Sequence, residues 1–447
     1  MNDRNLTEGN IRRQLIRLAV PLIAGNILQQ LYNTIDTLVV GYYCGRGQFA
    51  AVGVAGTVMN LFLFSIVGAC SGISILFAQY YGAEREDYFR GEHAASFFLG
   101  LFGTAVLSIA GLLLLKPVLK LLQTPSVLSM DVSVYLNIVL AGLPAAFLYN
   151  FYSAILRSVG NTRIALGILA VSAAVNIVLD FFMVGTCGME ISGAAYATVA
   201  AEILSAVLCI LYLRYHYPEL MFQRKDLKTS GSYVRRTVLF ASVSGFHQAG
   251  LYLGKLLVQG SVNTCGTEMV AAYTATGRIE GFANSFGDSG AAATSVLVAQ
   301  NYGAGEKKRV KKAFGESLRL LVILGLISAS ILFLTAKTAA GLMLGTQKGV
   351  SFQQAYSYLR VISFFYLFCF TGNTYAGYYD GIGKPLYTFF GAAGHIFLRA
   401  LLARFWVGRY GLASLATATG LGWILVNLFW TFLLYERKRT VSSRKYE

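Results

Sequence analysis

The feature that most constrains this chain is a series of long apolar runs separated by short polar stretches. Each run exceeds the roughly 20 apolar residues that a membrane-spanning helix needs, or comes close to it. Because lipid cannot satisfy backbone hydrogen bonds, and tilted strands need only ~10 residues, helices are expected. The twelve runs lie at roughly 14–43, 49–78, 93–115, 132–156, 162–184, 191–213, 237–262, 270–299, 313–336, 355–378, 385–407 and 411–435.

Composition excludes several other classes of protein. With 447 residues, 55% hydrophobic and 13% charged, the chain carries too much apolar surface for one soluble core. The net charge of +16 comes from Lys and Arg clustered between the apolar runs, so nucleic acid is not an expected partner. The six cysteines show no metal or disulfide spacing, and no catalytic or nucleotide-binding motif is present. We therefore expect neither an enzyme nor a bound cofactor.

Basic residues predict the orientation in the membrane. Placing the N-terminus in the cytoplasm assigns 25 Lys and Arg residues to cytoplasmic loops and tails, and only six to the opposite loops. This asymmetry follows the positive-inside rule. The first apolar run is too long for a signal-peptide core, so it should remain in the protein. The prediction is a multi-pass protein of the cell (plasma) membrane with both termini cytoplasmic.

An internal repeat divides the chain into two halves. Residues 50–83 align without a gap to residues 271–304, and the copies end in AQYYGA and AQNYGA. The longest internal polar stretch, 214–236, lies between them. We predict an N-lobe at 1–213, a cytoplasmic linker at 214–236 and a C-lobe at 237–447. The fold class is then all-α, with twelve transmembrane helices in two pseudo-symmetric six-helix lobes around a central cleft.

Polar side chains inside the first lobe form a predicted functional cluster, because such residues are costly in lipid. The first span carries four of them on one helical face: Asn26, Gln29, Asn33 and Asp36. Span five carries Asn176 and Asp180 four residues apart. Span six carries Thr198 and, four residues later, Glu202.

Counting from the span ends places Asp36, Asp180 and Thr198 at one depth in the outer half of the membrane. Two carboxylates at one depth can share a proton, because burial and like charge both favour the protonated form. Alternatively, these oxygens coordinate a hard cation such as Na⁺. A third reading is structural, with each side chain satisfying a neighbouring helix.

The second lobe is built differently. Lys255 lies in span seven, and span eight carries Glu280 and Asp288 with Arg278 nearby. An ion pair between Lys255 and one of the acids would be structural, whereas the same residues lining a substrate path would be functional. Later in the repeat, Tyr135-Leu136 and Gly160 match Tyr358-Leu359 and Gly383. This part of the repeat places Ala403 opposite Asp180, so the predicted acid pair is not duplicated.

Several of these segments together resemble the MATE (multidrug and toxic compound extrusion) antiporters. They are PLIAGNILQQLYNTIDTLVVG in span one, AQYYGA and AQNYGA, ILRSVGNTR after span four, NIVLDFF in span five and GAAYAT in span six. The resemblance covers nearly the whole chain and favours the bacterial and archaeal branch with first-lobe coupling acids. It implies a cation site at Asp36, Asn176, Asp180 and Thr198, and Pro21 matches the first-span proline of the family. Some members place a coupling acid in span seven, where this chain has Lys255.

The expected function is secondary active antiport. Small organic compounds would be exported in exchange for H⁺ or Na⁺ as the two lobes alternate their access, with Pro21 as a hinge and Asn26, Gln29, Asn33, Glu202, Lys255, Arg278, Glu280 and Asp288 along the substrate path. A flippase of a lipid-linked precursor is the alternative, and Lys255 and Arg278 are what favour it. The expected partners are an organic substrate and the lipid bilayer, and the protein is expected to function as a monomer.

Overall fold

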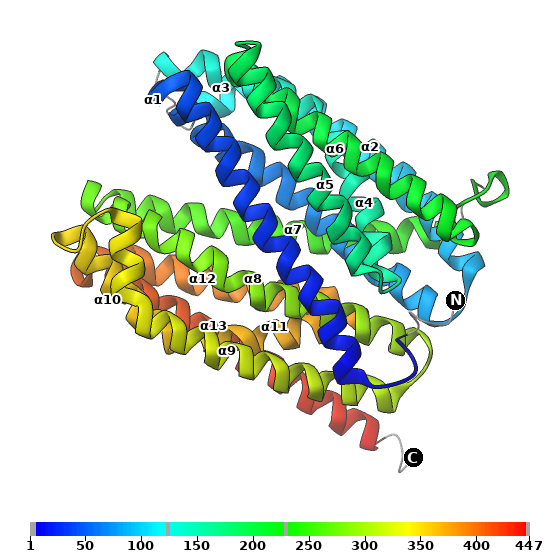
Figure 1. Ribbon diagram of the computed structural model, residues 1–447. Coiled ribbons are helices and arrows are strands. Elements are labelled where there is room, and N and C mark those ends of the chain that lie inside the picture. The colour runs from blue at the N-terminus through cyan, green and yellow to red at the C-terminus, as the bar shows by residue number, and fades with distance from the viewer. Residues whose placement is uncertain (1–5, 122–125, 228–230, 444–447) are drawn as a thin grey trace. The chain divides into compact units, whose positions relative to one another are not determined.

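The computed structural model describes residues 6–121, 126–227 and 231–443, and within these ranges the regular structure is helical without any strand. Figure 1 shows the helices in chain order. They are α1 (Ile11–Gly82), α2 (Glu86–Leu121), α3 (Ser126–Ala141), α4 (Leu143–Ser158), α5 (Thr162–Asp180), η1 (Phe181–Thr186), α6 (Glu190–His216), η2 (Pro218–Leu220), η3 (Arg224–Leu227), α7 (Gly231–Asn263), α8 (Thr267–Gly303), α9 (Lys307–Leu344), α10 (Val350–Ser363), α11 (Tyr366–Gly381), α12 (Pro385–Tyr410) and α13 (Leu412–Ser443).

Each of the twelve predicted segments is helical, so the all-α prediction is confirmed. The first two segments form α1, which breaks at Gly45, where φ is +85°. Glycine has no Cβ and adopts this left-handed backbone without strain. Eight helices in the described ranges are long and apolar enough to cross a membrane, and α3 with α4, bent by 47°, pass the same test only when taken together. The segments that fall short of this test are α7, α8 and the pair α10 and α11, which carry more polar residues.

The chain forms two compact units. Unit 1 contains Ile16–Ala249 together with Ala299–Glu306 and the segment before Asn10. Unit 2 contains Asn10–Leu15, Gly250–Val298 and the chain from Lys307 onward. The start of α7 and the end of α8 therefore pack with unit 1. The predicted lobe boundary at 214–236 stays a prediction, and its residues 228–230, like the chain ends at 1–5 and 444–447, lie outside the described ranges.

The core of unit 1 forms where α6 packs against α3, α4 and α5, and α2 packs against α3 and α4. Aromatic side chains fill this core, with Phe77, Phe89 and Phe151 fully buried and in ring contact. In a water-soluble protein, burying such a side chain adds roughly 1.5–3 kcal/mol to the free energy of unfolding. Tyr135 of α3 is also fully buried, at 2% exposure, and it carries a polar hydroxyl into the unit.

The core of unit 2 forms between α9, α10, α11, α12 and α13, the yellow to red helices of Figure 1. Tyr358, Tyr366 and Tyr379 are fully buried there. The hydroxyl of Tyr379 donates to the carbonyl of Trp430 at 2.7 Å. Both units therefore bury tyrosines whose hydroxyls need polar partners, so those partners show where polar groups lie inside each unit.

The two AQxYGA motifs meet inside unit 1. A Cβ added at Gly82 would collide with the backbone carbonyl of Gln300, and one added at Gly303 would collide with the carbonyl of Gln79. The repeat pairs Gly82 with Gly303 and Gln79 with Gln300, so the crossing is reciprocal. Glycine at both positions lets the ends of α1 and α8 approach at backbone distance.

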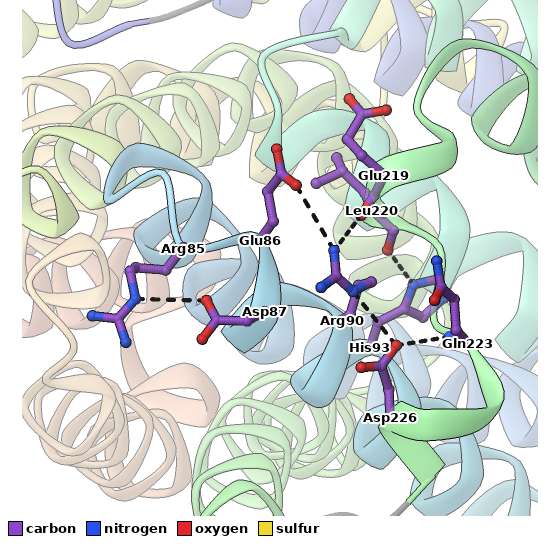
Figure 2. A network of polar contacts seen from close by, with 9 residues as sticks. All are labelled: Arg85, Glu86, Asp87, Arg90, His93, Glu219, Leu220, Gln223 and Asp226. Atoms are coloured by element: carbon purple, nitrogen blue, oxygen red, sulfur yellow. Dashed lines mark hydrogen bonds and ion pairs between the residues drawn. The ribbon is translucent and has the colours of Figure 1, made fainter.

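The segment between α6 and α7 is held against α2 by a polar network (Figure 2). Arg90 of α2 lies 3.5 Å from the Asp226 carboxylate and donates to the Glu219 carbonyl at 3.1 Å. His93, one turn further along α2, lies 3.0 Å from the carbonyl of Leu220. The described part of the predicted linker is therefore an ordered turn structure docked on unit 1.

Candidate functional site

Two polar clusters lie among the described helices, one in each unit. The first is in unit 1 and contains Asp36 of α1, Asn176 and Asp180 of α5, and Thr198 of α6. Asp180 is 0% exposed, Asn176 is 1% exposed and Asp36 is 8% exposed. Amphipathic spacing explains the arrangement, because residues four apart on α5 present the same face. Two of the helices that sequence spacing selected, α1 and α5, thus supply buried acid and amide groups to unit 1, and α6 adds the hydroxyl of the half-buried Thr198.

Asp36 and Asp180 interact directly. Each carboxyl group is the side chain that acts most strongly on the other. Neither oxygen of Asp180 nor Oδ1 of Asp36 accepts a hydrogen bond from a donor group in the described ranges, although all three atoms are buried. Two ionised carboxylates have no proton to share, so a hydrogen bond between them requires one of them to be protonated. The amide oxygen and nitrogen of Asn176 are buried without a partner as well. Five buried polar atoms of neighbouring side chains are therefore unsatisfied by the described residues.

Such a concentration is unusual, because the large majority of buried polar atoms in proteins have hydrogen-bond partners. An unsatisfied buried donor or acceptor costs about 1–3 kcal/mol. Thr198 adds a hydroxyl oxygen, half-buried, whose proton goes to the Ala194 carbonyl at 3.0 Å. Its lone pairs remain available as an acceptor. The cluster has the composition of a site for a proton, a water or a hard cation.

Two further features at this cluster escaped sequence reasoning. Tyr135 lies within electrostatic reach of Asp36 and Asp180 and next to Thr198. Immediately after Asp180, α5 continues as a π-helical turn, Phe181–Thr186. Such turns are rare and often occur at functional sites. The repeat pairs Tyr135 with Tyr358, and that match was the available signal for the tyrosine; no sequence pattern marked the π-helical turn.

The remaining first-lobe residues have varied environments. Asn26 and Glu202 are half-buried, whereas Gln29 and Asn33 are exposed. The carboxyl group of Glu202 lies within electrostatic range of the Tyr32 hydroxyl. Pro21 is buried, and α1 runs through it without a break, so the helix interruption lies at Gly45 instead. The roles predicted for these residues stay predictions.

The second cluster lies in unit 2 and is built around Glu280 of α8. The hydroxyl of Tyr358, on α10, donates to Glu280 Oε2 at 2.9 Å. The guanidinium of Arg399, on α12, donates to the Tyr273 hydroxyl at 3.4 Å and is electrostatically coupled to Glu280. Sequence reasoning missed Arg399, although a basic residue inside a predicted span was the signal.

The other predicted residues of this half are Lys255, Arg278 and Asp288, all exposed. The structural alternative, an ion pair from Lys255 to Glu280 or Asp288, is not formed. No nitrogen and oxygen of these side chains lie within 4.0 Å in the described ranges. Lys255 acts on both acids only at longer range.

A transition-metal centre finds no support in the side chains. No group of three or more His, Cys, Asp or Glu residues is gathered within the portion of the chain that the structure describes. The first cluster instead offers carboxylate, amide and hydroxyl oxygens, which suit hard cations.

The sequence also matches a known family along most of its length. The model of the MatE family matches residues 21–182 and 243–403, one copy in each half of the chain. The chain belongs to the MatE family. The first match contains Asp36, Asn176 and Asp180 but ends before Thr198, and the second contains Tyr273, Glu280, Tyr358 and Arg399. The matches confirm the resemblance to multidrug and toxic compound extrusion proteins.

Curated relatives and solved structures agree with this assignment. The probable multidrug resistance protein YpnP of Bacillus subtilis (strain 168) is 25% identical over 94% of this chain and 91% of its own length. The probable multidrug resistance protein NorM of Thermotoga maritima is 23% identical over 84% of this chain and 81% of its own length. A crystal structure of MATE in complex with MaL6 has a TM-score of 0.90 at 21% identity and covers 100% of both chains.

A second solved structure has the same fold. It is a MOP superfamily transporter from Pyrococcus furiosus, described as having a binding pocket of reverse polarity that suggests a different function. Its TM-score is 0.89 at 20% identity, and 98% of each chain is covered. This MatE protein is therefore a multi-pass helical membrane transporter, and it has the same fold as these two solved structures.

Proposed function

We propose that this MatE protein exports small organic compounds across the plasma membrane in exchange for H⁺ or Na⁺. The observation that carries the proposal is the set of five buried, unsatisfied polar atoms on Asp36, Asn176 and Asp180. A protein keeps such a costly arrangement where an ion or proton fills it during function.

The mechanism that this cluster supports is a change of charge. With the cation absent, two neighbouring carboxylates cannot both remain ionised at low cost, because like charges repel in a buried site. Binding of H⁺ or Na⁺ from the outer side relieves that repulsion. One charge moved through 100 mV supplies roughly 2.3 kcal/mol, which is enough to drive substantial accumulation of substrate.

Alternating access would connect this change of charge to export. Cation binding would favour the state that releases substrate outward, and cation release to the cytoplasm would reset the lobes. The orientation with both termini cytoplasmic rests on the distribution of basic residues. The lipid-flippase alternative gains no support from the relatives, whose names refer to multidrug resistance.

The test is counter-transport in proteoliposomes, with pH and Na⁺ gradients imposed separately against a panel of fluorescent dyes. We expect Asp36→Asn and Asp180→Asn each to reduce gradient-driven transport at least tenfold while the protein still elutes as a single folded species. The ion whose gradient drives wild-type uptake identifies the coupling.

Asp380→Asn is the matched control. Asp380 is a half-buried acid of α11, but its carboxylate accepts a hydrogen bond from Thr388 at 2.8 Å and so is satisfied. An asparagine oxygen can accept the same bond. We expect this variant to retain coupling, and full coupled transport by both Asp36→Asn and Asp180→Asn would refute the proposed site.

A further inference from the structure

Arg399 is half-buried, and no carboxylate within the described ranges forms an ion pair with its guanidinium. Its Nε is inaccessible and has no hydrogen-bond partner. Within the described ranges, its side chain donates one hydrogen bond, from Nη2 to the Tyr273 hydroxyl at 3.4 Å. In the described ranges no acidic oxygen lies within 4.0 Å of its nitrogens. A buried charge normally has an ion pair and several hydrogen bonds, so an unfilled donor here indicates a missing partner.

Glu280 does not fill that role, although it is the nearest candidate. It interacts with Arg399 electrostatically, but its Oε2 already accepts the Tyr358 hydroxyl at 2.9 Å. The acid thus compensates the guanidinium at a distance while leaving the forked donor edge of Arg399 open. Arginine binds planar carboxylates through that fork, which a lysine cannot reproduce.

Other donors of the same unit are also unused. Tyr273 accepts the bond from Arg399 and keeps its own hydroxyl proton for donation. The hydroxyl of Tyr366 is fully buried without a partner, and Tyr366 is electrostatically coupled to both Glu280 and Tyr358. Arg399, Tyr273 and Tyr366 together offer positive charge and hydroxyl donors from three helices, α12, α8 and α11.

We propose that Arg399, with Tyr273 and Tyr366, forms a site in unit 2 that binds the carboxylate of an organic substrate. Arg399 supplies the charge and the fork, and the tyrosine hydroxyls supply the remaining donors. This inference rests on the proposed export function and names the chemical class of the compound exported. It also gives the residue a specificity role, because a substrate without an anionic group leaves the donors of this site unpaired.

The experiment compares two dyes that differ in one group. Rhodamine 110 carries a free carboxylate, and rhodamine 123 is its methyl ester. Binding to purified protein is measured by fluorescence polarisation without any gradient, and transport is measured separately in proteoliposomes. We expect wild type to bind the acid dye and Arg399→Gln to weaken that binding at least tenfold, with the ester changed less than twofold.

Matched variants separate recognition from folding. Arg404→Gln removes an exposed arginine from the same helix and should leave both dyes unaffected. Arg399→Lys keeps the charge without the fork and should fall between wild type and Arg399→Gln. If Arg399 serves only to balance Glu280, the double variant Glu280→Gln with Arg399→Gln would restore acid-dye binding. Such restoration would overturn the proposal.

The remaining outcomes are also decisive. Equal loss of both dyes in Arg399→Gln, unchanged binding of the acid dye, or failure of wild type to bind it would each overturn the carboxylate site. Arg399-dependent binding with no gradient-driven transport would uphold this site and count against the proposed export function. Gradient-driven transport of the acid dye that is unchanged in Arg399→Gln would uphold the proposed export function and count against this site.

Discussion

The two polar clusters both lie among packed helices, but they differ in which charged groups lie close together. In unit 1, Asp36 and Asp180 act on each other and no basic side chain relieves them. In unit 2, Glu280 has a hydroxyl donor on one oxygen and a guanidinium within electrostatic range. The first cluster therefore carries acidic groups with no basic group acting on them among the described residues, and in the second the guanidinium of Arg399 has no acidic oxygen within 4.0 Å. The repeat duplicates the helices, while single substitutions decide what each cluster binds.

The largest expected effect comes from installing the missing acid. Ala403 is the repeat partner of Asp180 and is 1% exposed. In Ala403→Asp, a carboxylate replaces a buried methyl group. Even with Arg399 one turn earlier on α12 as a partner, overpacking and the burial of charge are expected to cost about 3–5 kcal/mol of stability. Unfolding by SDS in mixed micelles measures it, with Ala403→Ser as a small polar control. A stable Ala403→Asp protein would show that the second half also tolerates an acid at this position.

The second largest effect is the difference in stability between variants that remove one acid from each cluster. Glu280→Ala strips the partner from the Tyr358 hydroxyl and the compensation from Arg399, so we expect about 3 kcal/mol of destabilisation. Asp180→Ala removes a carboxyl that has no partner, so stability should stay within about 1 kcal/mol of wild type or rise. The same micelle titration measures both. Equal losses in the two variants would erase the contrast between the clusters.

The matched glycines Gly82 and Gly303, where the ends of α1 and α8 cross, test a feature that is the same in both halves of the chain. A methyl group at Gly82 or Gly303 would strike the backbone of the facing helix, which cannot rotate away as a side chain can. We expect Gly82→Ala and Gly303→Ala each to cost about 2 kcal/mol. The repeat-matched pair Gly56 and Gly277 has open space around the same methyl position, and alanine there should be tolerated. Thermal unfolding in detergent compares the four variants.

The smallest expected difference lies between the paired tyrosines. Tyr358→Phe removes a hydrogen bond to a carboxyl group, for which about 1–1.5 kcal/mol is expected. Tyr135→Phe removes a hydroxyl near the acid pair, and we expect a loss below about 0.5 kcal/mol, because no hydrogen bond to Asp36 or Asp180 depends on it. Thermal midpoints of the two variants provide the comparison. A larger loss for Tyr135→Phe would place that hydroxyl inside the cation site.

Much of the fold was readable because membrane insertion leaves few choices. Long apolar runs must become helices in lipid, and all twelve predicted segments are helical. Family membership was readable from motifs that recur in order along the chain. The break at Gly45 falls between the first two predicted runs, 14–43 and 49–78, whereas the π-helical turn after Asp180 was not predicted, because no sequence pattern marks it.

The candidate sites divide in the same way. Asp36, Asn176 and Asp180 could be identified from sequence alone. Polar side chains are energetically costly inside a membrane, and residues three or four apart share a helix face. Which polar atoms lack partners, and that Arg399 contacts Tyr273 rather than an acid, were decided only by tertiary structure. Periodicity fixes the face on which a side chain lies. The distance and angle to atoms from other helices follow from packing, and those quantities determine whether a buried charge is satisfied.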